Sequence, residues 1–167
     1  MPVLGEDTGQ ILGTVSGILI HPDTGVIEGV FVHAPGFFSH EDLFLGVVDI
    51  LHWGMRITVR SADVLSPLED RVRLQPLLAG DRPILGQRMM TESGMVLGRC
   101  RDVQFSTKDF RLEWLFPKRF FQWKIPVPAS QILEVRRDVV VIKEATPTEK
   151  ENAPDVLSLV PPMPEAA

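Results

Sequence analysis

Short apolar runs, separated by clusters of turn-forming residues, recur along most of the chain. ILGTVSGILI (residues 11–20) alternates apolar positions with small or polar ones, HPDTG supplies a turn, and VIEGVFV (residues 26–32) resumes the alternation. A period of two is typical of a strand with one buried face, so residues 18–32 predict a β-hairpin. DVQF, STKD and FRLEWLF (residues 102–116) repeat the order of strand, turn and strand.

The two halves of the chain share one order of residue types. Residues 2–32 lie over residues 87–117 at an offset of 85, without a gap, and the offset becomes 82 where residues 49–59 lie over residues 131–141. A three-residue change between these stretches is what an insertion in a surface loop produces. The pattern therefore predicts two copies of one small β unit.

Each half carries a Leu-Gly pair at the corresponding position. Gly13 stands in TGQILGTV and Gly98 in SGMVLGRC. A glycine inside a strand often marks a bulge or a place where another backbone comes close, because a side chain would collide there. We expect one of these features at both glycines.

The connection SPLEDRVRLQPLLAG (residues 66–80) predicts a helix. Ser66 is placed as the N-cap, Pro67 suits the first helical position, and Glu69 completes a capping box. Pro76 would end this helix early, because proline cannot donate the backbone hydrogen bond that a helix interior requires.

Beyond Glu144 the composition shifts to Pro, Ala and Glu, which predicts a flexible tail that contains one candidate docking segment, DVLSLV (residues 155–160). The expected fold class is all-β. The expected organisation is a first domain at residues 1–62, a linker with a short helix at 63–83, a second domain at 84–145 and a disordered tail at 146–167.

Composition narrows the classes of function. The 167 residues carry a net charge of −5, which argues against a dedicated nucleic-acid-binding protein, and one cysteine excludes an intramolecular disulfide. No run approaches 18 apolar residues, so we expect no transmembrane segment. The start, MPVLGEDTGQ, has neither the basic nor the apolar region of a signal peptide, so we expect a cytoplasmic protein.

With these residues in view, the chain resembles a tandem pair of PRC-barrel domains. The resemblance rests on TGQILGTVSGILIHPDTGVIEGVFV and SGMVLGRCRDVQFSTKDFRLEWLF, and on the strand-like ends DIL…ITV and QIL…VVV. It covers residues 2–60 and 85–144. The family includes the cytoplasmic domain of the photosynthetic reaction-centre H subunit and the C-terminal barrel of the ribosome-maturation factor RimM, so it implies two small β-barrels.

The resemblance implies binding and assembly rather than catalysis, because the family has no shared catalytic residues, and we expect no cofactor. Our first hypothesis is a non-catalytic scaffold whose partner is another protein. A second is a RimM-like role in ribosome maturation, with nucleic acid contacted only through the ribosome. A third is peripheral attachment to a membrane complex, as in the reaction-centre relative. The oligomeric state stays open.

Few side chains suggest chemistry. His33, His40, Glu41 and Asp42 fall in one loop, but their spacing matches no known set of metal ligands, so we interpret them as a solvated polar loop and expect no metal site. Cys100 occupies an apolar strand position and is interpreted as a small buried hydrophobe. No phosphate-binding glycine motif occurs, and we expect no enzyme activity.

The stretch PKRFFQWK (residues 117–124) is the candidate partner-binding site, because basic residues interleaved with aromatics can stack on bases or anchor at a membrane surface. The first half has a Phe-Phe pair in the equivalent loop. Because the pair recurs, we favour a structural role, in which it plugs the barrel or packs the two units together, over a partner surface. The candidate residues are Lys118, Arg119, Phe120, Phe121, Trp123, Lys124, Phe37 and Phe38.

Overall fold

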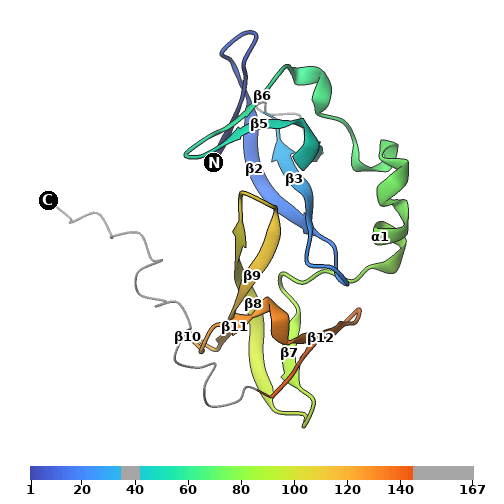
Figure 1. Cartoon of the computed structure of the whole chain (residues 1–167), viewed down its shortest axis with the longest axis vertical. Helices are drawn as coiled ribbons and strands as arrows, with labels where there is room; N and C mark the ends of the chain where they lie inside the picture. Colours follow the sequence, from blue (N-terminus) through green and yellow to red (C-terminus); the bar gives the residue numbers. More distant parts are fainter. Residues whose placement is uncertain (35–41, 145–167) are drawn as a thin grey trace, which may run out of the picture. The chain divides into compact units, whose positions relative to one another are not determined.

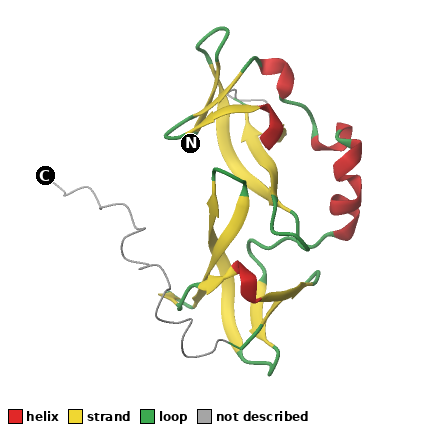
Figure 2. Cartoon of the chain, in the orientation of Figure 1, coloured by secondary structure: helices red, strands yellow, loops and turns green. Residues whose placement is uncertain are grey.

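The computed structural model describes residues 1–34 and 42–144. Strands dominate and form two sheets, which confirms the all-β prediction and is consistent with two small barrel-like domains (Figure 2). The candidate residues Phe37 and Phe38 and the expected tail at 146–167 lie outside the described residues. The predicted domain boundaries stay a prediction.

The first sheet has six strands in the order β4-β3-β2-β1-β6-β5. Figure 1 labels β2, β3, β5 and β6 of this sheet. Neighbouring strands are antiparallel, except that β1 and β6 run parallel. The β2–β3 pair is the predicted hairpin. The strands are β1 (Pro2–Gly5), β2 (Ile11–Ile20), β3 (Ile27–His33), β4 (Asp42–Gly46), β5 (Ile50–Trp53) and β6 (Ile57–Val59), with a 3-10 turn η1 (Val47–Asp49) between β4 and β5.

The second sheet follows the order β10-β9-β8-β7-β13-β12, with β11 also paired to β9. Its one parallel pair, β7 with β13, occupies the place of β1 with β6. The strands are β7 (Arg88–Thr91), β8 (Val96–Ser106), β9 (Arg111–Arg119), β10 (Gln122–Trp123), β11 (Val127–Pro128), β12 (Ile132–Val135) and β13 (Val139–Ile142), with a 3-10 turn η5 (Ala129–Gln131) before β12.

The pairing corrects the first offset by one residue. Val3 pairs with Gly13 and Met89 pairs with Gly98, so Val3 corresponds to Met89 at an offset of 86 rather than 85. The difference falls in the turn that follows β1, where one residue more or less disturbs no buried side chain. The gapless alignment of residues 2–32 was therefore wrong at its beginning.

A second one-residue correction falls at the end of each unit. Ile50 pairs with Val59 and Ile132 pairs with Ile142, so the offset of 82 holds for the first strand of this hairpin and becomes 83 for the second. The extra residue again lies in a turn. The register matters because a slip of one residue would move every side chain of a strand to the opposite face of the sheet.

The core of the first sheet is the face where apolar strand positions converge. Six aliphatic side chains are almost completely buried there: Val3, Val30, Val32, Leu45, Ile57 and Val59. A second cluster joins Phe44 of β4 to Leu68 and Leu74 of the connection, and Phe31 packs edge-on against Phe44 with ring centroids 5.7 Å apart. The connection therefore covers part of the first sheet.

The connection is mostly 3-10 rather than one helix. It runs through η2 (Ala62–Val64), η3 (Leu68–Asp70) and η4 (Val72–Leu74) before a short α-helix, α1 (Gln75–Gly80). Pro76 stands in the first turn of α1, where it is tolerated because its missing N–H has no partner to lose. The predicted start at Ser66 was wrong, since burial of Leu68 and Leu74 overrides the local capping signal.

Ser66 is a hydrogen-bond acceptor for a side chain rather than a helix N-cap. Its hydroxyl accepts a hydrogen bond from Arg71 Nε at 3.0 Å, and Arg71 Nη2 donates to the Val64 carbonyl at 2.8 Å. Because no helix N-terminus depends on Ser66, we expect Ser66→Ala to lower the free energy of unfolding by about 0.5 kcal/mol, at the bottom of the range for N-cap removal. Urea denaturation measures it, and a loss near 2 kcal/mol would contradict this assignment.

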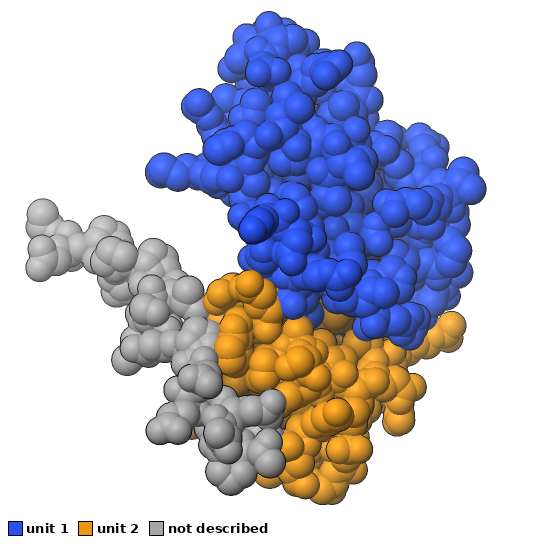
Figure 3. All heavy atoms as spheres, viewed as in Figure 1, with its two compact units in different colours: residues 1–83, 105–112 blue, residues 84–104, 113–167 orange. Residues whose placement is uncertain are grey.

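Two compact units divide the chain, one comprising residues 1–83 with 105–112 and the other residues 84–104 with 113–167 (Figure 3). The end of the β8–β9 hairpin thus belongs to the first unit. Ile27 N–H donates to the Phe110 carbonyl at 2.7 Å, and Leu112 N–H donates to the Gly25 carbonyl at 2.8 Å. Trp53 contacts the rings of Phe105 and Phe110 edge-on, with centroids 5.4 and 5.8 Å away.

Both Leu-Gly glycines sit where a neighbouring strand comes close, which confirms that prediction. A Cβ at Gly13 would lie 2.5 Å from the His33 carbonyl oxygen, and a Cβ at Gly98 would lie 2.6 Å from the Lys118 carbonyl oxygen. Gly98 also has a φ of +135°, a region that side chains rarely adopt. The repeated glycine is therefore a packing requirement of each sheet.

Candidate functional site

The basic and aromatic stretch forms a tight hairpin at one edge of the second sheet. Arg119 at the end of β9 pairs with Gln122 of β10, and Lys118 pairs with Trp123, so only Phe120 and Phe121 make the turn. Phe120 has a φ of +55°. A left-handed φ is uncommon for a bulky side chain and is held only where the surroundings impose it.

Both turn phenylalanines are exposed to solvent. The exposed fraction is 85% for Phe120 and 93% for Phe121. The expectation that this pair plugs a barrel was therefore wrong, and its packing between the two units stays a prediction. The reason is geometric, because a two-residue turn projects past the last strand of the sheet and leaves its side chains nothing to pack against.

Two cations of the hairpin lie over aromatic rings, one over Trp123 and one over Phe120. Lys118 Nζ lies 5.0 Å from the centroid of the Trp123 ring, and the Arg119 guanidinium lies 5.8 Å from the centroid of the Phe120 ring. Contacts at these distances are cation–π interactions, worth about 0.5–1 kcal/mol at an exposed site. Lys124 Nζ donates to the Gln122 side-chain oxygen at 3.4 Å. The structure thus brings together the six candidate residues that it describes.

A cavity opens beside this hairpin because the β9 ladder is interrupted. In the first sheet, β3 and β4 pair over five consecutive residues. In the second sheet, β9 pairs with two separate short strands, with β10 at Lys118 and Arg119 and with β11 at Trp114 and Leu115. Pro117 and Pro126 lie in the interrupted stretch, and neither has an N–H to donate. The result is a cavity of about 350 Å³ within the second unit.

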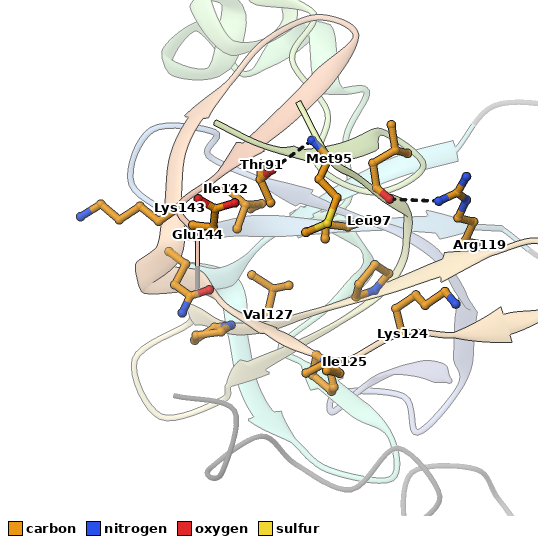
Figure 4. Close-up of a pocket in the computed structure, with 15 residues that line it drawn as sticks. Thr91, Met95, Leu97, Arg119, Lys124, Ile125, Val127, Ile142, Lys143 and Glu144 are labelled. Carbon is orange, nitrogen blue, oxygen red and sulfur yellow. Dashed lines mark hydrogen bonds between the residues drawn. The ribbon is translucent and has the colours of Figure 1, made fainter. Parts of the chain in front are cut away.

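The cavity has apolar walls and charged ends. Figure 4 shows Arg119 and Lys124 on one side of the apolar side chains and Lys143 and Glu144 on the other. Glu144 accepts a hydrogen bond from the Ser93 hydroxyl at 2.8 Å, so its carboxylate is already engaged. The apolar wall includes Met95, Val96, Leu97, Pro117, Ile125, Pro126, Val127 and Ile142.

Sequence reasoning did not find this cavity. The available signal was the spacing of Pro117, Pro126 and Pro128, three residues that cannot donate to a ladder, in and opposite a predicted strand. That signal says where pairing fails, but which side chains line the opening depends on the register of β9 against β11. The cavity therefore extends the candidate site from a hairpin to a hairpin with an adjoining hollow.

The polar loop of the first unit forms a small hydrogen-bonded cluster. Ser16 Oγ donates to Asp42 Oδ2 at 2.7 Å, and His33 Nδ1 lies 3.0 Å from Asp42 Oδ1. These bonds hold the pKa of the Asp42 carboxyl below its usual range. His40 and Glu41 lie outside the described residues. Within residues 1–34 and 42–144, no group of three His, Cys, Asp or Glu side chains is placed to hold a metal ion.

Asp42 stands between Ser16 and His33 in this cluster, so the histidine is not bonded to the serine hydroxyl. A nucleophilic serine needs a base within hydrogen-bond reach of its own oxygen. The arrangement instead ties β2, β3 and β4 together where β3 ends and β4 begins.

Cys100 is completely buried, as the sequence predicted, and its burial raises the pKa of the thiol to about 12. The folded chain therefore keeps the proton between pH 9 and pH 12, where the unfolded chain loses it, so this contribution to stability falls as pH rises through that window. At pH 8 we expect no reaction with a chromogenic disulfide reagent until the chain unfolds. Rapid reaction of the folded protein would contradict this burial.

Comparison with known families assigns the first unit. Residues 1–65 match the family model of the PRC-barrel domain. The chain contains one PRC-barrel domain at these residues. The match covers β1 to β6 and the sheet that they form. No curated protein matches the chain.

The matched residues have the topology described above, in which the hairpin β2–β3 lies between β4 and the parallel pair β1–β6. The PRC-barrel match ends before η3 and does not reach the basic and aromatic hairpin. In the described part of the chain, no helix has the length and hydropathy to cross a membrane.

Proposed function

We propose that the chain is a non-catalytic assembly module that binds another protein through the Phe120–Phe121 hairpin. The observation that carries this proposal is the exposure of two adjacent phenylalanines, 85% and 93%, in a turn that holds Phe120 at a left-handed φ. Large apolar side chains exposed together mark interaction surfaces.

The composition of the hairpin favours a protein partner. Aromatic residues and arginine are enriched among the side chains that dominate protein–protein affinity, and Phe120, Phe121, Trp123 and Arg119 stand within five positions. The cavity beside the hairpin offers a hollow into which a partner's side chain can fit. A PRC-barrel module suits such a role because it brings no catalytic residues of its own.

We further infer that residues 84–144 form a second copy of the domain. The order of strands supports this, because β7 to β13 pair as β1 to β6 do, with the single parallel pair in the corresponding place. The glycine that meets a carbonyl oxygen recurs as Gly13 and Gly98. In this view the second copy has diverged at its edge, where the prolines open the ladder and the hairpin carries the binding surface.

A RimM-like role on RNA is the second candidate, supported by the three cations Lys118, Arg119 and Lys124 around exposed aromatic rings. Charge distribution favours it locally, because the described residues of the second unit carry nine Lys and Arg against six Asp and Glu. Sedimentation with ribosomal particles, weakened by salt and lost in K118E/R119E/K124E, would support this candidate.

The proposal is tested by capturing partners from the source lysate with the full-length protein and with F120S/F121S. Proteins captured by the first and lost from the second, at equal amounts of folded bait, are the expected result. Recovery of the same proteins by both baits would remove the hairpin from the proposal.

A further inference from the structure

We propose that the cavity of the second unit binds a segment of this same chain, DVLSLV (Asp155–Val160). The site is built from the described residues of the second unit. The occupant is identified by its place in the sequence, its apolar pattern and its charge. This inference stands independently of which partner the hairpin binds.

Position is the first argument. Glu144, the last described residue, lines the cavity together with Lys143. Ten residues separate Glu144 from Asp155, and ten residues can span at most about 35 Å. A segment tethered so close reaches an effective concentration of about 1 mM, so it can occupy the cavity even with weak intrinsic affinity.

Residue pattern is the second argument. In an extended segment alternate side chains share a face, which places Asp155, Leu157 and Leu159 together. Two leucines match the apolar wall of Met95, Leu97, Ile125, Val127 and Ile142. A volume of about 350 Å³, near the lower end of ligand cavities, suits a few aliphatic side chains better than a large cofactor.

Charge is the third argument. Residues 145–167 carry four Asp and Glu against one Lys, whereas the described residues of the second unit have a net charge of +3. Arg119 and Lys124 form a cationic end of the apolar wall, whereas Lys143 stands beside Glu144 at the other end (Figure 4). An aspartate on the same face as two leucines would therefore meet Arg119 or Lys124 when the leucines enter the cavity from that end.

The buried cysteine makes a direct test simple. Cys100 is fully buried, so a nitroxide spin label reacts selectively with a cysteine introduced by Ser158→Cys. In the full chain we expect the label to weaken the amide NMR signals of Leu97, Ile125 and Ile142 at least about twofold, since a tethered segment at about 1 mM occupies the cavity for much of the time.

Two matched variants sharpen the result. L157D/L159D keeps the label and the chain length but removes the apolar face, and I125D places a charge at a half-exposed wall residue; either should restore the signals. Unchanged weakening in L157D/L159D, or weakening spread evenly over the chain, would overturn the proposal.

A mixture of spin-labelled protein with isotope-labelled, spin-free protein identifies the source of the segment. No weakening in the mixture is expected for binding within one chain, whereas equal weakening would show that a second copy supplies the segment and would overturn the proposal as stated. Because this experiment contains no partner, its failure leaves the capture test of the hairpin unaffected.

Discussion

Gly98→Ala is expected to lower the free energy of unfolding by about 4 kcal/mol, because two costs add at this position. A Cβ would lie 2.6 Å from the Lys118 carbonyl oxygen, which belongs to the backbone of β9 and cannot rotate away. The φ of +135° is itself strained for any residue with a side chain. Thermal or urea denaturation measures the loss, which would be a large part of the stability of a small domain.

Gly94→Ala is the matched control for Gly98→Ala. Gly94 also has a positive φ, +86°, but a Cβ there would meet nothing within 4 Å. It should therefore show the cost of the dihedral angle alone, about 1 kcal/mol. Equal losses for the two variants would contradict the close approach of β9 to Gly98 and would make the repeated glycine a matter of backbone angle only.

The sequence predicted what depends on periodicity and missed what depends on packing. Alternation predicted the β2–β3 hairpin, and the repeated Leu-Gly pair predicted a close approach at Gly13 and Gly98, because both signals lie in the residues themselves. The sequence did not predict the one-residue shifts of register, because the shifts fall in turns, where buried and exposed positions do not alternate.

The connection and the candidate site also combine features that the sequence predicts with features that depend on packing. The capping signal at Ser66 is local, and it lost to the burial of Leu68 and Leu74 against Phe44. The basic and aromatic composition of the candidate hairpin identified it in the sequence. Whether its aromatic rings face the core or the solvent depends on the neighbouring strands, and the two-residue turn exposes Phe120 and Phe121 to solvent. The cavity requires knowing which residue of β9 faces Val127.

F120S/F121S is the second large expected effect. If the hairpin is the centre of a protein interface, loss of both rings should weaken the complex at least about 100-fold, since each buried aromatic anchor of such an interface contributes about 2 kcal/mol or more. The fold should be unaffected to within about 0.5 kcal/mol, because both side chains are exposed. Titration calorimetry with the captured partner measures the first quantity and denaturation the second.

The control for this double variant is V48S/M55S. Val48 and Met55 are exposed to 82% and 98%, so the control removes a comparable pair of exposed apolar side chains from the first unit. Binding should be retained. Equal weakening by both double variants would indicate a nonspecific apolar contribution and would remove the hairpin from the centre of the interface.

Site-specific photo-crosslinking tests the central claim most directly. A benzophenone amino acid in place of Phe121 is irradiated in native lysate, with the same amino acid in place of Met55 as the reference. The account predicts a discrete protein adduct at position 121 that is missing at position 55. Adducts to RNA or lipid alone, or the same adducts at both positions, would contradict a protein-binding role for this hairpin.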